Sequence, residues 1–357
     1  MSAHLHGLAT ALPPYCLNQA EVASRAAEIF GDRYPQFSRL AKTFETSGIE
    51  QRHSVVPLDW FTQAHGWKDR SAAYVAGAGA LFIDAARTAL NDAGWAAWEV
   101  DCIVTVSSTG IATPTLEARV PGEMGFRDDV MRVPIFGLGC AGGVSGLATA
   151  AALARGDAGS KVLLVVVETC SLSFRADRLQ KADIIAAVLF GDGAAAACIS
   201  TDAPRGAHVT LGRGHQMTWP DTLGIMGWDV DDTGLGVVFD RSIPAFVAEH
   251  FGSATAGALA AADLTPARID RYVCHPGGAK VIAAIEEAMD LAAGSLDAER
   301  RVLRQCGNMS APTVLFVLRA VLDAGTTGQM MACALGPGFT ASYLPLHVAE
   351  NMTERTA

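Results

Sequence analysis

Hydrophobic residues recur along the chain with two spacings, and these two patterns alternate. Residues 80–92 have helical spacing, whereas residues 100–106 (VDCIVTV) form a short apolar, β-branched run typical of a strand. Residues 132–136 predict another strand, and residues 161–167 (KVLLVVV) predict a strand buried on both faces. Between these two strands, residues 142–155 predict a small-residue helix without a charged face, which requires burial on all sides. The alternation predicts an α/β fold.

The sequence also resembles itself. When Cys140 is aligned with Asn308, the small-residue helix after Cys140 falls on an apolar helix after Asn308, and the strands that follow these helices also align. With a shift of one further position, the segment 100–104 aligns with the segment 269–273. We therefore predict two similar α/β halves, residues 1–200 and 201–357, with a chance match of apolar elements as the alternative. Cys140 and Asn308 would then face a common cavity near a pseudo-twofold axis.

The composition narrows the class of protein. Hydrophobic residues make up 50% of the chain and charged residues 18%, which excludes a disordered protein. The net charge of −10 makes binding to nucleic acid or to an anionic membrane unfavourable. Every apolar run is far shorter than the roughly 18 residues of a membrane span, so no transmembrane segment is expected.

The cysteines and histidines indicate the compartment and the absence of a metal site. The eight cysteines contain no CxxC pair, and the N-terminus lacks the features of a signal peptide. These observations predict a cytoplasmic protein with reduced thiols. The histidines show no spacing typical of metal ligands, so we expect no metal.

A glycine-rich segment at residues 137–142 (GLGCAG) allows two interpretations. It matches G-x-G-x-x-G between a strand and a helix, so one interpretation is an NAD-dependent oxidoreductase. However, the motif lies deep in the chain and carries a cysteine, which a dinucleotide fingerprint does not need. In the other interpretation Cys140 is a nucleophile on a sharp turn, where the positive end of the helix favours the thiolate. For the other seven cysteines we favour buried structural thiols.

His275 and Asn308 are candidate partners of Cys140. His275 ends a predicted strand and precedes a Pro-Gly-Gly turn, and strand ends are where α/β folds bind ligands. Asn308 lies at a predicted helix start, where it would either cap the helix or donate an N–H to an oxyanion.

Cys140, His275 and Asn308, in this order, resemble the catalytic set of the type III polyketide synthases, which are chalcone synthase-like members of the thiolase fold. The matching blocks are GLGCAGG (137–143), LFGDGA (189–194), HPGG (275–278), GNMS (307–310) and GPG (336–338). The resemblance implies a layered αβαβα fold built from two α/β halves, a homodimer and no cofactor. A ketoacyl synthase III-like enzyme shares the three residue types, but it is expected to carry His-Gln and to lack the Gly-Pro-Gly loop.

The resemblance also implies a reaction. Cys140, as a thiolate paired with the His275 imidazolium, would take an acyl group from an acyl-CoA starter. Malonyl-CoA would lose CO₂ to give an enolate that attacks this acyl group. His275 and Asn308 would donate hydrogen bonds to the enolate oxygen and to the tetrahedral oxyanion.

Further roles are carried over by resemblance alone. Phe190 would separate the CoA tunnel from the cavity, and Thr113 would lie on a loop that reaches the neighbouring subunit. The expected pocket residues are Cys170, Ser173, Trp228, Val237 and Phe339. Arg39 and Lys42 would contact CoA phosphates, although Gln36 stands where a further lysine is often found. Ser108, Glu168 and Ser310 would hold a water relay used in aldol cyclisation.

Within the family, residues 108–114 (STGIATP) and 226–229 (MGWD) are similar to the bacterial branch that makes alkylresorcinols and alkylpyrones from fatty acyl-CoA. Small residues at 113, 170 and 173 suit an alkyl tunnel, whereas Trp228 would shorten one pocket. We expect an aliphatic starter and several malonyl units. A chalcone- or phloroglucinol-type synthase with another starter and a non-catalytic thiolase-fold protein are the alternatives.

Overall fold

The computed structural model describes residues 1–178, 180–204 and 208–349. The strands are β1 (Ala3–Ala11), β2 (Tyr15–Asn18), β3 (Gln51–Ser54), β4 (Cys102–Val106), β5 (Met131–Ile135), β6 (Val162–Thr169), β7 (Asp192–Ser200), β8 (Val209–Leu211), β9 (His215–Thr218), β10 (Met226–Val230), β11 (Leu235–Phe239), β12 (Arg271–Cys274), β13 (Gly328–Gly336) and β14 (Thr340–Val348). The helices are α1 (Gln19–Phe30), α2 (Phe37–Thr46), α3 (Trp67–Ala93), α4 (Pro121–Met124), α5 (Gly142–Gly156), α6 (Lys181–Leu189), α7 (Ile243–Ala260), α8 (Ala279–Ala288), α9 (Asp297–Cys306) and α10 (Thr313–Asp323).

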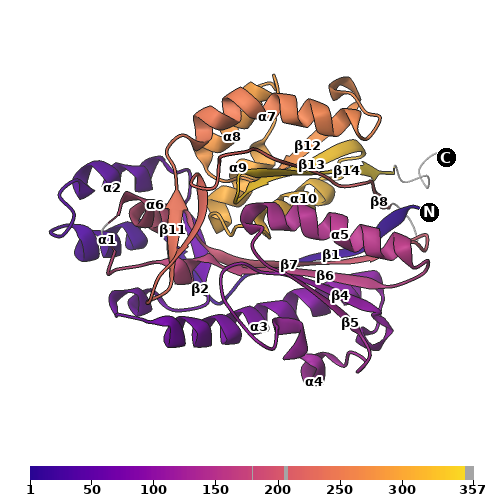
Figure 1. Ribbon diagram of the computed structural model, residues 1–357, viewed down its shortest axis with the longest axis horizontal. Helices are drawn as coiled ribbons and strands as arrows, with labels where there is room; N and C mark the ends of the chain where they lie inside the picture. The colour runs from indigo at the N-terminus through magenta and orange to yellow at the C-terminus, as the bar shows by residue number, and fades with distance from the viewer. Residues whose placement is uncertain (179, 205–207, 350–357) are drawn as a thin grey trace.

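Helices and sheet form layers (Figure 1). One sheet runs in the order β12-β13-β14-β8-β1-β7-β6-β4-β5 and folds over so that its two wings enclose α5 and α10. Helix α3 covers the outer face of the wing that contains β1, β7 and β6, while α7 and α8 cover the other wing. This arrangement confirms the predicted layered αβαβα fold.

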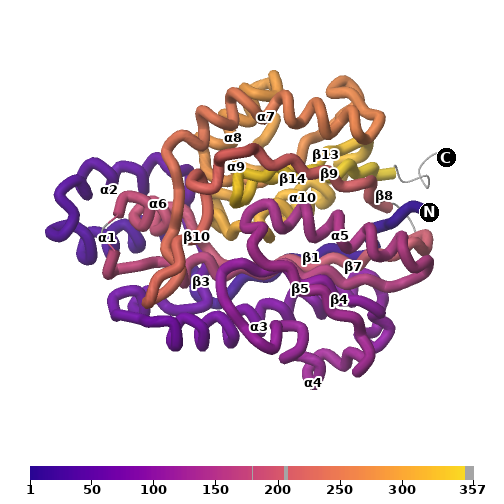
Figure 2. Tube along the Cα trace, viewed as in Figure 1, coloured from indigo at the N-terminus to yellow at the C-terminus, as the bar shows by residue number. Residues whose placement is uncertain are grey.

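The two wings repeat one another. Strands β4 and β6 are parallel and pair Cys102 with Val162, while β12 and β13 are parallel and pair Arg271 with Met330. These two pairs are the same segments that align in the comparison of the sequence with itself. The next strand is antiparallel in both wings, because β7 pairs with β6 and β14 pairs with β13. Figure 2 shows the earlier part of the chain in the lower wing and the orange-to-yellow part in the upper wing.

Helices α5 and α10 pack closely where the wings face each other. A Cβ atom on Gly143 would lie 2.2 Å from the carbonyl oxygen of Ala311, so this position tolerates no side chain. The first residues of α5 are buried as predicted, but Ala152 near its other end is exposed. Burial on all sides therefore holds for the part of α5 that lies next to the site.

Some element boundaries differ from the prediction. Helix α3 begins at Trp67 rather than at residue 80, because Gly77 and Gly79 weaken the periodic signal while the helix continues through them. Gly77 lies against Val55, whose Cβ would be 2.5 Å from a Cβ at this position. Strands β10 and β11 form a separate two-stranded hairpin. Within the described ranges, no helix combines the length and the hydropathy that crossing a membrane would require.

Candidate active site

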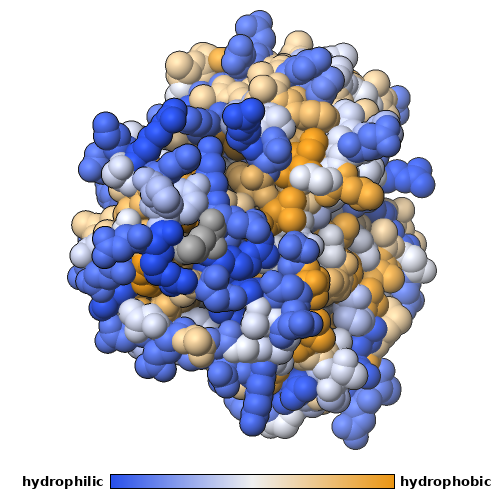
Figure 3. Space-filling view, turned by 60° about the vertical axis from the view of Figure 1, so that its left-hand side comes forward, coloured by the Kyte–Doolittle hydropathy of each residue, from blue (hydrophilic) through white to orange (hydrophobic). Residues whose placement is uncertain are grey.

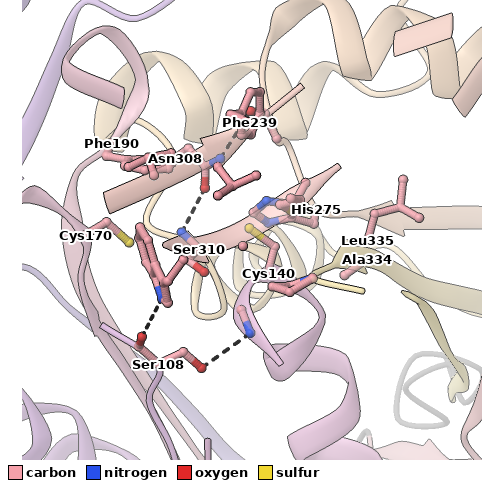
Figure 4. Close-up of a pocket in the computed structure, with 18 of the residues that line it drawn as sticks. Ser108, Cys140, Cys170, Phe190, Phe239, His275, Asn308, Ser310, Ala334 and Leu335 are labelled. Carbon is pink, nitrogen blue, oxygen red and sulfur yellow. Dashed lines mark hydrogen bonds between the residues drawn. The ribbon is translucent and has the colours of Figure 1, made fainter. Parts of the chain in front are cut away.

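A cavity of about 410 Å³ is lined by residues from both halves, and Cys140, His275 and Asn308 all line it. Figure 4 shows the three residues coming from separate loops into this space. Most other lining residues are apolar: Ile111, Met226, Leu235, Ile243, Phe251, Val281, Ile285 and Leu335. The fold thus brings together three polar side chains that lie far apart in the sequence.

Cys140 lies on the turn between β5 and α5. The turn uses positive φ at Gly137 (92°) and Gly139 (46°), a region that favours glycine. The Ser108 hydroxyl accepts hydrogen bonds from the backbone N–H groups of Gly137 (3.0 Å) and Gly139 (3.4 Å). A Cβ on Gly139 would lie 2.6 Å from Pro337 Cδ, so the terminal Gly-Pro-Gly loop packs directly on the turn. These contacts fix the backbone that carries the thiol.

The same glycines do not leave space for a dinucleotide. In a dinucleotide fold the second glycine of the motif lets the pyrophosphate approach the backbone, and this glycine is Gly139 here. A Cβ on Gly139 would lie 2.6 Å from Pro337 Cδ, so the Gly-Pro-Gly loop occupies the space that a pyrophosphate would need. The geometry does not support the NAD-dependent interpretation.

His275 directly follows β12. Its backbone N–H donates to the carbonyl of Cys333 (2.9 Å), and the preceding Cys274 N–H donates to the buried Glu299 carboxylate (3.0 Å). The imidazole is 5% exposed, and neither ring nitrogen has a hydrogen-bond partner among the described residues. Neither nitrogen is therefore committed to a hydrogen bond within the described part of the protein.

Asn308 is held by its own amide group. Its Oδ1 accepts from the Ser310 backbone N–H (2.8 Å), and its Nδ2 donates to the Gly277 carbonyl (3.1 Å). An amide NH₂ carries two hydrogens, so one N–H remains for a ligand. The helix-capping role considered for Asn308 is wrong, because α10 begins at Thr313 and its N-cap position is Pro312.

Burial controls the protonation of the site. It raises the pKa of the Cys140 thiol to about 11, with a hydrogen bond to Ser310 acting in the opposite direction. It also lowers the pKa of His275 to about 3. The expected thiolate and imidazolium at neutral pH are thus disfavoured, because a dry cavity disfavours both charged forms. A neutral thiol beside a neutral imidazole is the favoured state.

Four of the expected pocket residues line the cavity. Phe190, Cys170, Trp228 and Val237 all contribute to its wall. The Trp228 indole N–H donates to the Ser108 carbonyl (2.8 Å), which fixes the ring in place, and Trp228 pairs with Val237 across the β10–β11 hairpin. Trp228 therefore reduces the room on that side, as its size suggested.

Three other expected residues lie elsewhere. Phe339 is fully buried and packs on Phe246, with ring centroids 4.7 Å apart, so it is part of the hydrophobic core rather than of the cavity wall. Ser173 lines a second, small cavity and donates its hydroxyl to the Cys170 carbonyl (2.7 Å). Thr113 precedes a cis-Pro114 and is not among the residues that line the main cavity.

The residues expected to form a water relay are only partly connected. Ser108 and Ser310 line the cavity, whereas Glu168 is fully buried behind it. The Glu168 carboxylate accepts from the Ser108 backbone N–H (2.9 Å) and from the Thr109 hydroxyl (2.7 Å). The Ser108 hydroxyl is occupied by the glycine turn, so Glu168 contacts the backbone of Ser108 rather than its side chain. Burial raises the pKa of Glu168 to about 7.

The candidate CoA contacts are on the surface. Arg39 and Lys42 belong to α2 and lie outside the cavity lining. Both side chains are exposed to solvent. Their positions are compatible with binding of a phosphate group.

Several residues around the site carried no sequence signal. Arg52 is buried beneath the loops of Phe190 and Asn308, and Thr109 holds Glu168. Both lie in short polar stretches where burial is not expected. All eight cysteines are free thiols, and of the seven that we predicted to be buried, Cys16 is exposed.

Comparisons with known proteins place the chain in a family. The family model of the chalcone and stilbene synthases, N-terminal domain, matches residues 2–203, and the model of the C-terminal domain of the same enzymes matches residues 210–349. The chain is a type III polyketide synthase. It is therefore an acyltransferase with a thiolase-like fold.

The polyketide synthase resembles proteins with different products. It is 38% identical over 347 residues to 1,3,6,8-tetrahydroxynaphthalene synthase of Streptomyces peucetius subsp. caesius, covering 94% of this chain and 91% of the relative. It is 28% identical to the alpha-pyrone synthesis polyketide synthase-like Pks18 of Mycobacterium tuberculosis, covering 94% and 88% of the two chains. The crystal structure of the tetrahydroxynaphthalene synthase of Streptomyces coelicolor A3(2) superposes with a TM-score of 0.92 at 26% identity, covering 97% of this chain and 99% of the other.

Proposed function

We propose that this synthase transfers an acyl group from an acyl-CoA starter to Cys140 and extends it with malonyl-CoA. The observation that supports this proposal most directly is the convergence of Cys140, His275 and Asn308 on one buried cavity. A thiol next to an unpartnered imidazole and an oriented amide provides a nucleophile, a base and an oxyanion donor.

The protonation states suggest how acylation proceeds. The neutral His275 imidazole takes the thiol proton while Cys140 attacks the thioester carbonyl, because a separate thiolate is costly in a dry cavity. The free N–H of Asn308 donates to the oxyanion that forms. Collapse of this intermediate expels CoA as a thiolate, which takes the proton from His275, and the acyl group remains on Cys140.

Extension then uses the same donors. The carboxylate of malonyl-CoA leaves as CO₂, and its electron pair forms the thioester enolate, whose oxygen accepts from His275 and Asn308. The enolate carbon attacks the acyl group on Cys140 and releases the sulfur, so carbon–carbon bond formation needs no strong base. We propose that no bound cofactor or metal takes part.

We propose an aliphatic acyl starter and cyclisation to an alkylresorcinol or alkylpyrone. The apolar cavity wall supports this, and so does a second cavity of about 50 Å³ that shares Phe190 and Cys170 with the first. Apolar side chains such as Val22, Ile29 and Phe61 line this second cavity together with Arg25 and Arg52, and its volume has room only for the end of an alkyl chain. The similarity to Pks18, named for alpha-pyrone synthesis, points in the same direction.

A second candidate product is an aromatic naphthalene or benzene derivative. It is favoured by the 38% identity to a 1,3,6,8-tetrahydroxynaphthalene synthase and by the 26% identity to a phloroglucinol synthase. The fixed Trp228 ring, which reduces the room in the cavity, also favours a short starter.

We propose that the enzyme acts as a homodimer in the cytoplasm. Strand β5 is the outermost strand of its wing, and Met131 (49%), Phe136 (60%) and the nearby Ile111 (55%) are exposed. Hydrophobic residues also form a band on the face shown in Figure 3. An unpaired edge with exposed apolar residues suits pairing with a second copy, and analytical ultracentrifugation at micromolar concentration tests it.

Incubation with radiolabelled malonyl-CoA and a panel of starters of two to sixteen carbons tests the reaction. We expect labelled, CoA-free products whose masses increase with starter length. A product formed from malonyl-CoA alone would favour the second candidate. Absence of labelled product with every starter, and with malonyl-CoA alone, would refute the proposed function.

A further inference from the structure

Arg52, in β3, is a buried cation without a counter-ion. Its side chain is only 3% exposed, and no carboxylate lies within ion-pair distance among the described residues. Burial lowers the pKa of Arg52 to about 9, with no charged group acting on it. Two of its nitrogens, Nε and Nη2, also lack hydrogen-bond partners. Such a group costs stability, so its presence calls for another explanation.

The contacts that Arg52 does make lead to the active site. Its Nη1 donates to the carbonyl oxygens of Ala187 (2.5 Å) and Phe190 (3.3 Å). Both carbonyls lie at the C-terminal end of α6, where a cation is favourable because of the helix dipole. Arg52 thereby holds the backbone from which the Phe190 ring enters the cavity.

The same residue supports the loop of Asn308. A Cβ on Gly191 would lie 3.2 Å from the Cβ of Arg52, and one on Gly307 would lie 3.3 Å from it. These two glycine positions lie next to Phe190 and Asn308, respectively. The loops are also joined directly, because the Asn308 N–H donates to the Leu189 carbonyl (2.8 Å) and the Gly191 N–H donates to the Asn308 carbonyl (3.0 Å). Arg52 therefore lies beneath the point where the two loops meet.

We propose that Arg52 is a positioning residue that fixes Phe190 and Asn308 relative to each other for the malonyl-CoA step. This inference rests on the proposed function, in which Phe190 borders the CoA tunnel and Asn308 stabilises the enolate. Cys140 is held by different contacts, from Ser108 and from the Gly-Pro-Gly loop. Acylation uses Asn308 for one oxyanion, whereas extension uses it for the enolate and for the oxyanion of condensation. Acylation of Cys140 should therefore depend less on Arg52 than decarboxylation and extension do.

Arg52→Met tests this inference, because methionine fills part of the space without donating hydrogen bonds. We expect kcat/KM for malonyl-CoA to fall by about 10- to 100-fold, as displacement of a positioning group does. Arg52 also lines the second cavity, so acylation is followed with acetyl-CoA, which has no long alkyl chain to place there. The acylation rate, measured by intact-protein mass spectrometry, should fall by a smaller factor, less than about 10-fold. Arg52→Lys, which retains a donor, should recover part of the malonyl-CoA rate.

Arg155→Met is the matched control. Arg155 also donates to two backbone carbonyls, those of Leu211 and Gly212, but it lies outside the residues that line the main cavity. This variant should leave the ratio of extension to acylation unchanged. Thermal unfolding of all variants separates loss of folding from loss of positioning.

The outcomes distinguish the two proposals. If the wild-type protein neither acylates Cys140 nor decarboxylates malonyl-CoA, the proposed function fails and this inference fails with it. If the wild type is active and Arg52→Met reduces acylation and extension by the same factor, or neither of them, only the role of Arg52 is refuted.

Discussion

The two halves of the molecule place different chemistry at equivalent positions. Cys140 and Asn308 are equivalent in the internal repeat, and each precedes a central buried helix. In the first half the turn presents a thiol to the cavity, whereas in the second half the Asn308 amide binds Ser310 and Gly277 of its own half. A shared architecture therefore supplies two equivalent positions with different side chains. In the proposed function the thiol at one position attacks the substrate, and the amide at the other stabilises negative charge.

The outer edges of the two wings differ in a similar way. Strand β5 ends the first wing with exposed side chains. Strand β12 ends the second wing, but the Glu299 carboxylate accepts from its Cys274 N–H and pairs with Arg271 at 2.5 Å. The β5 edge therefore carries exposed side chains, whereas at the β12 edge a buried carboxylate already accepts from a backbone N–H of the edge strand.

Replacing the proposed nucleophile of the first half should abolish acyl-enzyme formation and product formation. Cys140→Ala removes the only atom proposed to carry the acyl group, so we expect no acyl-enzyme by mass spectrometry and no labelled product. Cys170→Ala is the matched control, because Cys170 is also a buried cysteine that lines the cavity, and this variant should still form the acyl-enzyme. Elongation by Cys140→Ala would contradict the assignment.

Replacing the equivalent residue of the second half should have a smaller effect. Asn308→Ala removes one oxyanion donor but leaves the thiol, so the condensation rate should fall by about 100- to 1000-fold. Steady-state assays with labelled malonyl-CoA measure this loss. Equal rates for variant and wild type would mean that His275 alone supports the enolate.

The contact between the two central helices can be tested by stability. In Gly143→Ala the added Cβ would overlap the carbonyl of Ala311, so we expect the free energy of unfolding to fall by about 1–3 kcal/mol. Gly79→Ala, in α3, has no atom within 4 Å of the new Cβ and should raise it by about 0.5–1 kcal/mol. Urea unfolding measures the free energy of unfolding of both variants. Similar free energies for the two variants would refute the close packing of α5 against α10.

Glu168 should make the reactivity of Cys140 and the stability of the protein depend on pH. Its charge contributes to the raised pKa of Cys140, so Glu168→Gln should increase the rate of iodoacetamide alkylation of Cys140 above pH 7.

Because the pKa of Glu168 is raised to about 7, the contribution of Glu168 to stability is complete below pH 4.5 and is lost as the pH rises through 7. The melting temperature of Glu168→Gln should therefore depend less on pH over this range. Parallel profiles for variant and wild type would contradict this role.

Much of the fold could be predicted because its signals are local. The strands at 100–106 and 161–167 and the small-residue helix after Cys140 consist of residues whose hydropathy alone requires burial, and the structure contains all three. The repeat was detectable because equivalent elements have similar lengths. The three proposed catalytic residues were found because each is a reactive or polar side chain at the end of an apolar element.

The remaining features depend on contacts between distant segments. Phe339 follows the Gly-Pro-Gly loop, but its ring turns into the core beside Phe246, which no nearby residue indicates. Arg52 lies in a polar segment, and only the meeting of two remote loops buries it. The protonation of Cys140 also could not be predicted, because it depends on how dry the assembled cavity is.

The pairing of β1 with β8 joins the two wings through backbone hydrogen bonds into one sheet. The halves are therefore not two bodies connected by a hinge, and separating them would break a strand pair. A substrate cannot enter by a clamshell movement of the halves. The β10–β11 hairpin is the part of the cavity wall that lies outside the main sheet, and it contributes Met226, Trp228 and Val237 to that wall.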